Sequence, residues 1–374
     1  MERELKKLYL RFLKFFKKDY FLNVRKFSTS LKNLNIPRNV LEKFFSNYEK
    51  PPFLLFLKNL KDIVFSKTPF DFILKNYEED WSLWRHIKFL EKESLIEIKK
   101  DGKIKILKKK LFSLIPRPKE EWEIKEILEK KMKRKINPKD FSPNFFFGNF
   151  FKVKKEFDQM PISQSSAIFL VKKILDYLPL KKFFLFVGDD DFISLYLTLV
   201  DPEIQVSVYD IDDEILGLIR KIKKKFKLKI ETKKVDIEKE KNLEKKFIGF
   251  LANPVYTEDG VKEFLIFGKK NLSLQGGFCF LVFGDEGIGN RILFLEKFFA
   301  KENLVTLEKI NQKIYYPHIL LYEEDKEIKR RLKEFFPEKL IEKSPKLGAT
   351  LYVFFSFPFK PKRIKFKRPM YAYL

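Results

Sequence analysis

The sequence is poor in the residues that hold most disulfides and metal ions. It contains one cysteine, Cys279, and two histidines, His86 and His318. A single cysteine excludes an internal disulfide framework and a cysteine-based zinc site, and two histidines are too few for a histidine-rich metal site. We therefore expect neither of these metal sites, and we expect no prosthetic group. The scarcity of cysteine fits a reducing cytoplasm.

Long apolar runs are also missing, although hydrophobic residues make up 45% of the 374. No stretch approaches the roughly 20 apolar residues that cross a bilayer. Residues 1–21 interleave Lys and Arg with Leu and Phe, and they lack the apolar core of a secretory signal. We expect an amphipathic helix that packs against the protein, with membrane-surface binding as the alternative, and a cytoplasmic protein that does not enter the membrane.

Acidic residues are the minority, 52 against 78 basic residues, which gives a net charge of +26. A basic excess usually indicates a polyanionic partner such as nucleic acid. The lysines are spread along the whole chain, however, and abundant Lys and Glu with little Cys is typical of thermophile surfaces. We therefore expect adventitious contact with nucleic acid rather than a nucleic-acid substrate.

The chain is long enough for two domains. Apolar residues at the start of the chain recur at the spacing of a helix, and residues 1–116 are expected to form an N-terminal helical domain. Residues 117–155 read as a charged helix and a connector rich in Pro, Asn and Phe. Residues 156–374 are expected to form the catalytic domain.

A helix followed by a hairpin is predicted near the end of the N-terminal domain. Residues 83–93 have helical spacing, and residues 95–100 and 103–107 alternate as strands on either side of Asp101-Gly102. This order is that of a winged helix. Such a unit binds DNA in some proteins and serves dimerisation or packing in others, so it does not by itself give a function.

The catalytic domain alternates strand and helix signals, which indicates an α/β fold with a mostly parallel sheet. Seven strands are expected, at residues 182–187, 205–209, 229–232, 247–252, 277–283, 304–309 and 349–357. Helices are expected on both faces of this sheet. Ligands of such sheets bind at the carboxyl ends of the strands, so we expect the site in the loops after the first, second and fourth strands.

The loop after the first strand carries Gly188 and then three acids, Asp189, Asp190 and Asp191. Nucleotide-binding loops usually hold several glycines here, because backbone amides must approach an anion. Acids at a helix N-terminus can also be caps that complement the helix dipole, but capping accounts for one or two acids rather than three. The loop therefore predicts a ligand that presents positive charge.

The next two loops supply further acids. Asp210 ends the second strand, where a carboxylate can accept hydrogen bonds from ribose hydroxyls. Asp212 and Asp213 are expected to cap the following helix. Asp236, after the third strand, either meets an adenine amino group or is a solvated loop acid.

The loop after the fourth strand begins with Asn253-Pro254 and places Tyr256 shortly after it. Such a turn can hold a planar or amine-bearing substrate, and an ordinary turn is the alternative. Upstream of the first strand, Asp158 lies in a short segment that we expect to cover the site as a lid.

Together these elements resemble the N(4)-bis(aminopropyl)spermidine synthases, the branched-chain polyamine synthases of thermophiles. The resemblance covers about residues 155–300, and the helix and hairpin before them resemble the N-terminal domain of that family. The residues that carry it are Phe157-Asp158-Gln159, Gly188-Asp189-Asp190-Asp191 with Ser194, Tyr209-Asp210-Ile211-Asp212, Asn253-Pro254 with Thr257, and Gly276-Gly277.

The resemblance implies a homodimeric enzyme that moves aminopropyl groups from decarboxylated S-adenosylmethionine to the secondary amine of spermidine. Methylthioadenosine leaves, and no metal takes part. The implied fold is a methyltransferase-like Rossmann domain, in which the last strand of the sheet is antiparallel. Asp190 is implied as the base, with Asp189 and Asp191 orienting the amine and holding the ammonium of the co-substrate. The other implied site residues are Gly188, Asp210 and Asp236 for the co-substrate and Asp158, Asn253 and Tyr256 for the polyamine.

The sequence departs from the family at Asn253-Pro254-Val255, where an Asp-Pro-Pro motif is usual, and its linker lacks the paired cysteines of some members. Asn253-Pro254-Val255-Tyr256 is also near the Asn-Pro-Pro-Tyr motif of S-adenosylmethionine-dependent amino-methyltransferases. Methylation of nucleic acid is therefore the alternative function, although three carboxylates would repel the methionine carboxylate. A non-catalytic DNA-binding protein with a decayed enzyme domain is a third reading.

Overall fold

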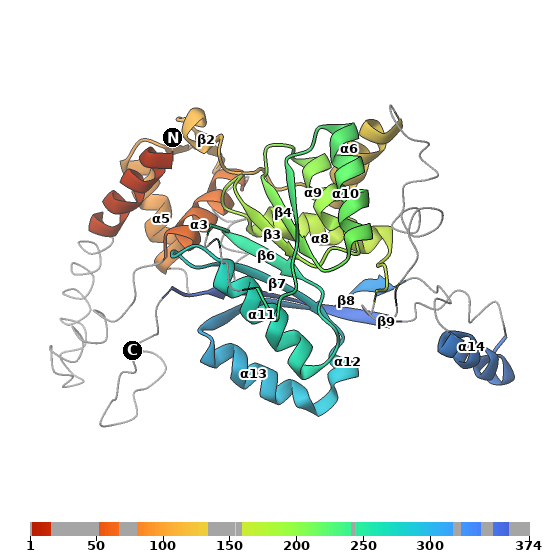
Figure 1. Cartoon of the computed structure of the whole chain (residues 1–374). Coiled ribbons are helices and arrows are strands. Elements are labelled where there is room, and N and C mark those ends of the chain that lie inside the picture. The colour runs from red at the N-terminus through yellow and green to blue at the C-terminus, as the bar shows by residue number, and fades with distance from the viewer. Residues whose placement is uncertain are drawn as a thin grey trace, which may run out of the picture. The chain divides into compact units, whose positions relative to one another are not determined.

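The computed structural model describes residues 2–15, 52–66, 81–133, 154, 159–240, 244, 246–316, 323–337 and 347–358. The chain divides into two compact units (Figure 1). One comprises residues 1–115 with 358–374, and the other comprises residues 116–357. In the described part of the chain, no helix has both the length and the apolar character needed to cross a bilayer.

The N-terminal unit contains helices and one short hairpin. Its labelled elements are α3 (Phe53–Phe65), α5 (Trp81–Lys92), β1 (Ile96–Ile98), β2 (Ile104–Ile106) and the 3-10 turn η2 (Lys109–Phe112). Residues 2–15 form a further helix, whose Leu5, Leu8 and Phe12 are fully buried. Its apolar face therefore packs against the protein, as predicted. The predicted hairpin is confirmed, since β1 and β2 pair antiparallel, while the winged-helix assignment stays a prediction.

The second unit is built around a seven-stranded sheet in the order β5-β4-β3-β6-β7-β9-β8. Its strands are β3 (Phe184–Val187), β4 (Val206–Asp210), β5 (Ile230–Lys234), β6 (Gly249–Ala252), β7 (Gly277–Phe283), β8 (Leu304–Tyr316) and β9 (Leu347–Ser356). The first five strands are mutually parallel, and β9 is antiparallel to both β7 and β8. The methyltransferase-like Rossmann fold predicted from the sequence is confirmed.

Helices cover both faces of this sheet. Helices α8 (Gln164–Tyr177), α9 (Ile193–Val200) and α10 (Asp213–Phe226) lie on one face, and α11 (Glu258–Asn271) and α13 (Ile292–Lys301) lie on the other (Figure 1). The remaining elements of this unit are α6 (Glu121–Lys133), α12 (Asp285–Ile288), the 3-10 turn η5 (Gly289–Arg291) and α14 (Glu323–Phe335). Strands β3 and β7 are buried along their whole length. Double-sided coverage explains why they read as continuous apolar runs in the sequence.

One glycine sets how closely α11 packs on the sheet. A Cβ atom added at Gly268 would lie 2.4 Å from the ring of Phe250 in β6. The missing side chain therefore lets the helix approach the aromatic core directly.

The strand order reverses between β3 and β6, which are neighbours in the sheet although β4 and β5 lie between them in sequence. Crevices that bind ligands form at such reversals, outside the carboxyl ends of the strands. The loops that follow β3, β4 and β6 are those in which the sequence places its unusual acids and the Asn-Pro turn.

Candidate active site

The loop after β3 begins with a glycine that its backbone requires. Gly188 has a φ of +73°, in the left-handed region that favours glycine. Its N–H donates to the carbonyl of Tyr209 at 2.8 Å. The ring of Phe264 would lie 3.7 Å from a Cβ at this position. Gly188 thus lets the chain turn from β3 across the end of β4.

The three acids after Gly188 have different surroundings. Asp189 is buried, and both of its carboxylate oxygens lie 3.3 Å from the N–H of Ser194 in the first turn of α9. It therefore caps that helix, which was the alternative to a ligand contact, and it does not line the cavity described below. Its predicted substrate role stays a prediction.

Asp191 is also buried and lies outside the cavity lining. Its Oδ1 accepts the N–H of Ile162 at 2.8 Å, and its Oδ2 accepts Nδ2 of Asn253 at 3.1 Å. Burial is the largest cause that raises the pKa of Asp191 to about 7, against these two hydrogen bonds, which lower it. Asp191 joins two parts of the site, and its substrate contact also remains a prediction.

Asp190 is the acid of the three that lines the cavity. Burial raises the pKa of its carboxyl well above the ordinary value, and the neighbouring Asp191, Asp210 and Asp189 raise it further. The N–H of Met160 donates to this carboxylate and acts in the opposite direction. A carboxyl group in this position holds a proton more readily than a solvent-exposed aspartate, and a nearby cation would reverse that effect.

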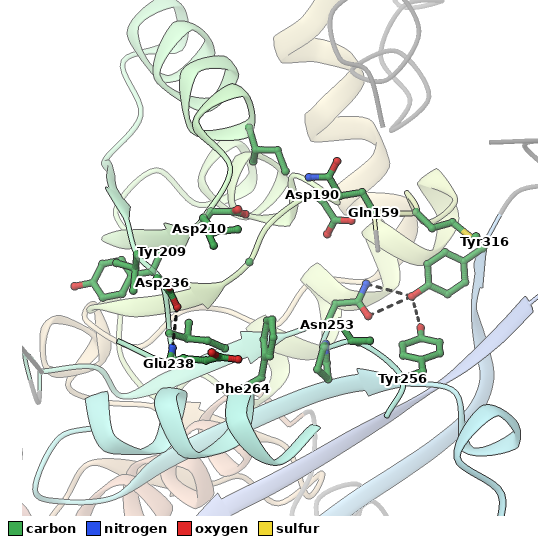
Figure 2. A pocket seen from close by; sticks show the side chains of 18 residues that line it. Gln159, Asp190, Tyr209, Asp210, Asp236, Glu238, Asn253, Tyr256, Phe264 and Tyr316 are labelled. Atoms are coloured by element: carbon green, nitrogen blue, oxygen red, sulfur yellow. Dashed lines mark hydrogen bonds between the residues drawn. The ribbon is translucent and has the colours of Figure 1, made fainter. Parts of the chain in front are cut away.

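The cavity has a volume of about 460 Å³ and is drawn in Figure 2. It is lined by Gln159, Met160, Gly188, Asp190, Tyr209, Asp210, Ile211, Ile215, Val235, Asp236, Ile237, Glu238, Asn253, Pro254, Val255, Tyr256, Phe264 and Tyr316. Four of these are acids, and none is Lys, Arg or His. The whole chain has a net charge of +26. The described lining of this cavity therefore has the opposite sign of charge to the chain as a whole.

Asp210 lies at the carboxyl end of β4 and faces the cavity (Figure 2). Its Oδ2 accepts the N–H of Asp189 at 3.0 Å, and its Oδ1 accepts the N–H of Asp212 at 2.9 Å. Burial raises the pKa of Asp210 to about 6, and these amides limit the rise. The backbone amide of Ile211 also lowers this pKa, so of about four acceptor sites on the carboxylate at least one stays available for a further hydrogen bond.

Asp236 and Glu238 line the cavity after β5. Asp236 accepts the N–H of Glu238 at 3.2 Å and Nζ of Lys239 at 2.7 Å, and the contact with Lys239 is the largest cause that lowers its pKa. These contacts are those of a solvated loop acid, and Asp236 also borders the cavity, so its contact with an adenine amino group stays a prediction. Glu238 was missed in the sequence because an exposed loop acid has no distinguishing pattern.

The helix-capping role expected of Asp212 is confirmed. Its Oδ1 accepts the N–H of Glu214 at 2.9 Å, at the start of α10. The same carboxylate accepts Nζ of Lys154 at 2.8 Å and Nε2 of Gln159 at 2.9 Å, so it also holds these two side chains. Asp213 instead occupies the first turn of α10 and pairs with Lys234 at 2.6 Å. Asp158 lies outside the described residues.

Asn253, Tyr256 and Tyr316 form the wall opposite Asp210 (Figure 2). Nδ2 of Asn253 donates to the Tyr316 hydroxyl at 3.2 Å, and the hydroxyl lies 3.3 Å from Oδ1 of the same amide. The hydroxyls of Tyr256 and Tyr316 are hydrogen-bonded to each other. Asn253 thus connects buried Asp191 to two phenols that border the cavity.

Tyr316 was missed because the sequence predicted a strand ending at residue 309. The observed β8 continues to Tyr316, with an irregular register between Ile310 and Ile314. The polar residues between those two interrupt the alternation that marks a strand. Beyond the irregularity, the carbonyl of Tyr315 accepts the N–H of Ser163 at 2.8 Å, which ties the end of β8 to the start of α8.

The described residues contain no group of three or more His, Cys, Asp or Glu side chains arranged to hold a metal ion. The carboxylates of the loop after β3 point to different partners, as the contacts of Asp189 and Asp191 show.

Two solved structures are similar in fold. The branched-chain polyamine synthase from Thermus thermophilus, in complex with N4-aminopropylspermidine and 5'-methylthioadenosine, is 15% identical, with a TM-score of 0.48 over 84% of this chain and 91% of that one. A putative RNA methyltransferase from Pyrococcus horikoshii is 15% identical, with a TM-score of 0.41 over 56% of this chain and 92% of that one.

In sequence, an uncharacterised protein of Methanocaldococcus jannaschii is 35% identical over 134 residues, which span 35% of this chain and 34% of that protein. The match thus spans about a third of that relative's length. Residues 149–334, about half of this chain, match the family described as the branched-chain polyamine synthase A C-terminal domain. These residues include the acid-bearing loops, the Asn-Pro turn and Tyr316, and through them the chain belongs to the branched-chain polyamine synthase family.

Proposed function

We propose that this chain transfers aminopropyl groups from decarboxylated S-adenosylmethionine to the secondary amine of spermidine, which yields branched polyamines and methylthioadenosine. One observation carries the proposal: the described lining of the cavity contains four acids and no basic residue, in a strongly basic chain. The family membership of residues 149–334 supports the same class of reaction.

The charges of the two substrates complement this lining. Decarboxylated S-adenosylmethionine keeps an ammonium and a sulfonium but has no carboxylate, and spermidine carries three amines that are protonated at neutral pH. Carboxylates form charge-assisted hydrogen bonds to such groups. S-adenosylmethionine that keeps its carboxylate would bring that group toward Asp190. Repulsion between the two negative charges would weaken its binding.

In this proposal the nucleoside half of the co-substrate lies against β4 and β5. The lone pairs of Asp210 that backbone amides leave available would accept ribose hydroxyls. Asp236 would accept the adenine amino group. Ile211, Ile215 and Val235 line this end of the cavity and supply apolar contact for the base.

Asp190 is proposed as the base. The secondary amine of spermidine has a pKa near that of lysine, about 10.4, and it must lose a proton before it can attack. Asp190 accepts that proton, and the nitrogen lone pair then attacks the carbon bonded to sulfur. The carbon–sulfur bond breaks with its electron pair going to sulfur, so neutral methylthioadenosine leaves. The raised pKa of Asp190 makes it a stronger base than an ordinary aspartate. The difference between its pKa and that of the amine is therefore smaller, which favours proton transfer.

Asp189 and Asp191 are proposed as positioning residues. Asp189 holds the loop on the N-terminus of α9, and Asp191 holds Asn253. Both also lie near enough to Asp190 to raise its pKa, so they contribute negative charge without touching substrate. Tyr256 and Tyr316 would offer phenol oxygens to an ammonium at the polyamine end of the cavity.

Methyl transfer from S-adenosylmethionine to an amino group of nucleic acid is the second candidate. The position of the Asn253-Pro254 turn and Tyr256 at the cavity favours it. One calorimetric comparison separates the two: binding of the co-substrate with and without its carboxylate. Tighter binding of the decarboxylated form, by tenfold or more, is expected. Tighter binding of the carboxylated form would favour the methyltransferase.

Product analysis then tests the reaction itself. Incubation with spermidine and decarboxylated S-adenosylmethionine should release methylthioadenosine and new polyamines that chromatography separates. Unchanged spermidine, at high temperature and alkaline pH, would contradict the proposal.

A further inference from the structure

The hairpin of the N-terminal unit carries concentrated positive charge that the proposed chemistry does not use. Residues 99–110 contain seven lysines and a single acid, Asp101. All seven lysines are exposed. We refer to the seven lysines of residues 99–110 as the lysine hairpin.

Few of these charges are neutralised within the described part of the chain. Nζ of Lys103 lies 2.9 Å from Asp101, and Nζ of Lys105 lies 3.0 Å from Glu97 across the hairpin. The other five lysines form no ion pair there. Mutual repulsion of five clustered cations disfavours the free surface, and a polyanion would relieve that repulsion.

The backbone holds these lysines in place. At the tip, the N–H of Lys99 donates to the carbonyl of Lys103 and the N–H of Gly102 donates to the carbonyl of Lys99, each at 2.9 Å. Gly102 has a φ of +80°, which the tight turn requires. Beyond β2, the turn η2 is anchored by the buried Phe112. A preordered cationic surface loses less conformational entropy on binding than a disordered tail.

We propose that the lysine hairpin binds the phosphate backbone of duplex nucleic acid, with the nucleic acid as a partner and not as a substrate. A two-stranded β-ribbon has the width that the major groove admits. Lys103 and Lys105 alternate along one strand at about twice 3.3 Å. The unpaired lysines lie at the turn and after β2, so they extend the positive charge at both ends of the hairpin. Lysine is a point charge suited to phosphates. The binding is therefore independent of base sequence and strongly dependent on salt.

The test measures fluorescence anisotropy of a labelled mixed-sequence DNA duplex with the full chain. The triple variant K108A/K109A/K110A should bind at least tenfold more weakly at about 100 mM salt. The slope of log K against log salt should fall by about 2 to 3, because each lost phosphate contact removes about 0.9. K99A/K100A, at the other end of the hairpin, should lower the slope by about 2.

A matched control removes the same charge elsewhere. K224A/K270A/K301A changes three exposed lysines in the last turns of α10, α11 and α13, and it should weaken duplex binding less than threefold. Equal losses in both triple variants would mean that only overall charge matters and would overturn the proposal. Binding to phosphatidylserine vesicles in preference to the duplex would overturn it too. Aminopropyl transfer is expected to be unchanged in the hairpin variants.

Discussion

The hydroxyl of Tyr316 lies 3.2 Å from Nδ2 of Asn253, the same amide nitrogen that donates to Asp191 at 3.1 Å. Through this amide, the last residue of β8 is connected to the acidic loop after β3. The hydroxyl of Tyr256 extends the connection to a second point on the cavity wall. The position of one buried carboxylate therefore depends on a strand at the far edge of the sheet.

Tyr316→Phe should lower kcat for aminopropyl transfer about tenfold, the equivalent of about 1.4 kcal/mol. Loss of the hydroxyl removes a hydrogen-bond partner of both Asn253 and Tyr256, so the amide of Asn253 is positioned less firmly by its remaining contact with Asp191. Tyr177→Phe is the matched control, because the hydroxyl of Tyr177 bonds Glu308 at 3.0 Å and its side chain does not line the cavity. Steady-state kinetics of both variants decide the point, and equal kcat values in the two would contradict a positioning role for Tyr316.

Asp190→Asn should fold normally and lose activity by about 10² to 10⁴, the range for removal of a general base. The variant should also be more stable than the parent at pH 8, because a charge surrounded by three acids is removed. Asp213→Asn, an exposed acid paired with Lys234, serves as control and should keep full activity. Chromatography of the polyamine products gives the rates. Activity within tenfold of the parent would remove Asp190 from the proposed mechanism.

Polycations should stabilise the fold more at pH 8 than at pH 5. Burial raises the pKa of Asp191 to about 7 and that of Asp210 to about 6, above the unfolded value of about 3.9. Between the unfolded and folded pKa values, the folded state binds more protons than the unfolded state. The two carboxyl groups therefore contribute less stability as pH rises from about 4 through 7. At pH 8 the carboxylates are ionised and repel one another until a polycation binds.

Thermal melting with saturating spermidine measures this effect. A clear rise in Tm is expected at pH 8 and little change at pH 5, with sodium chloride of equal ionic strength as the control for screening. A rise of the same size at both values of pH would show that spermidine binds elsewhere on the protein.

Much of the fold could be predicted from sequence because its signals are local. Buried strands such as β3 are continuous apolar runs, and the cap Asp212 stands directly before its helix. The positions of Asp189, Asp190 and Asp191 were also evident, since three acids after a strand are unusual.

The directions in which these three aspartate side chains point were not evident from the sequence. Adjacent residues in a turn point to different neighbours, and those neighbours come from distant parts of the chain, such as Ile162 and Asn253 for Asp191. Tyr316 escaped prediction for a related reason. The irregularity between Ile310 and Ile314 breaks the strand pattern, and pairing with β9, which follows later in the chain, restores it.

Alanine substitutions at two helical glycines should change the free energy of unfolding in opposite directions. Gly268→Ala places a Cβ 2.4 Å from the ring of Phe250 and should lower the free energy of unfolding by about 1 to 3 kcal/mol. Gly217→Ala, in α10, has nothing within 4 Å of the added Cβ and should raise it by about 0.4 to 1 kcal/mol. Thermal or denaturant unfolding of both variants compares them directly. Equal effects would mean that α11 packs less closely on β6 than described.

Asn253→Asp should couple the site to pH. Nδ2 of Asn253 donates to Oδ2 of Asp191 at 3.1 Å, so an aspartate there would set two carboxylates against each other. One of the pair must then hold a proton or both must separate. The variant should lose stability relative to the parent at pH 8 but not at pH 5, and its activity profile should shift to a different pH.

Asn253→Ser provides the comparison, because it removes the amide without adding charge. It should lower activity without a new dependence of stability on pH. Melting curves at both values of pH, with kinetics for all three proteins, complete the test. If Asn253→Asp loses no more stability at pH 8 than Asn253→Ser, the amide of Asn253 does not hold the carboxylate of Asp191 as the distances indicate.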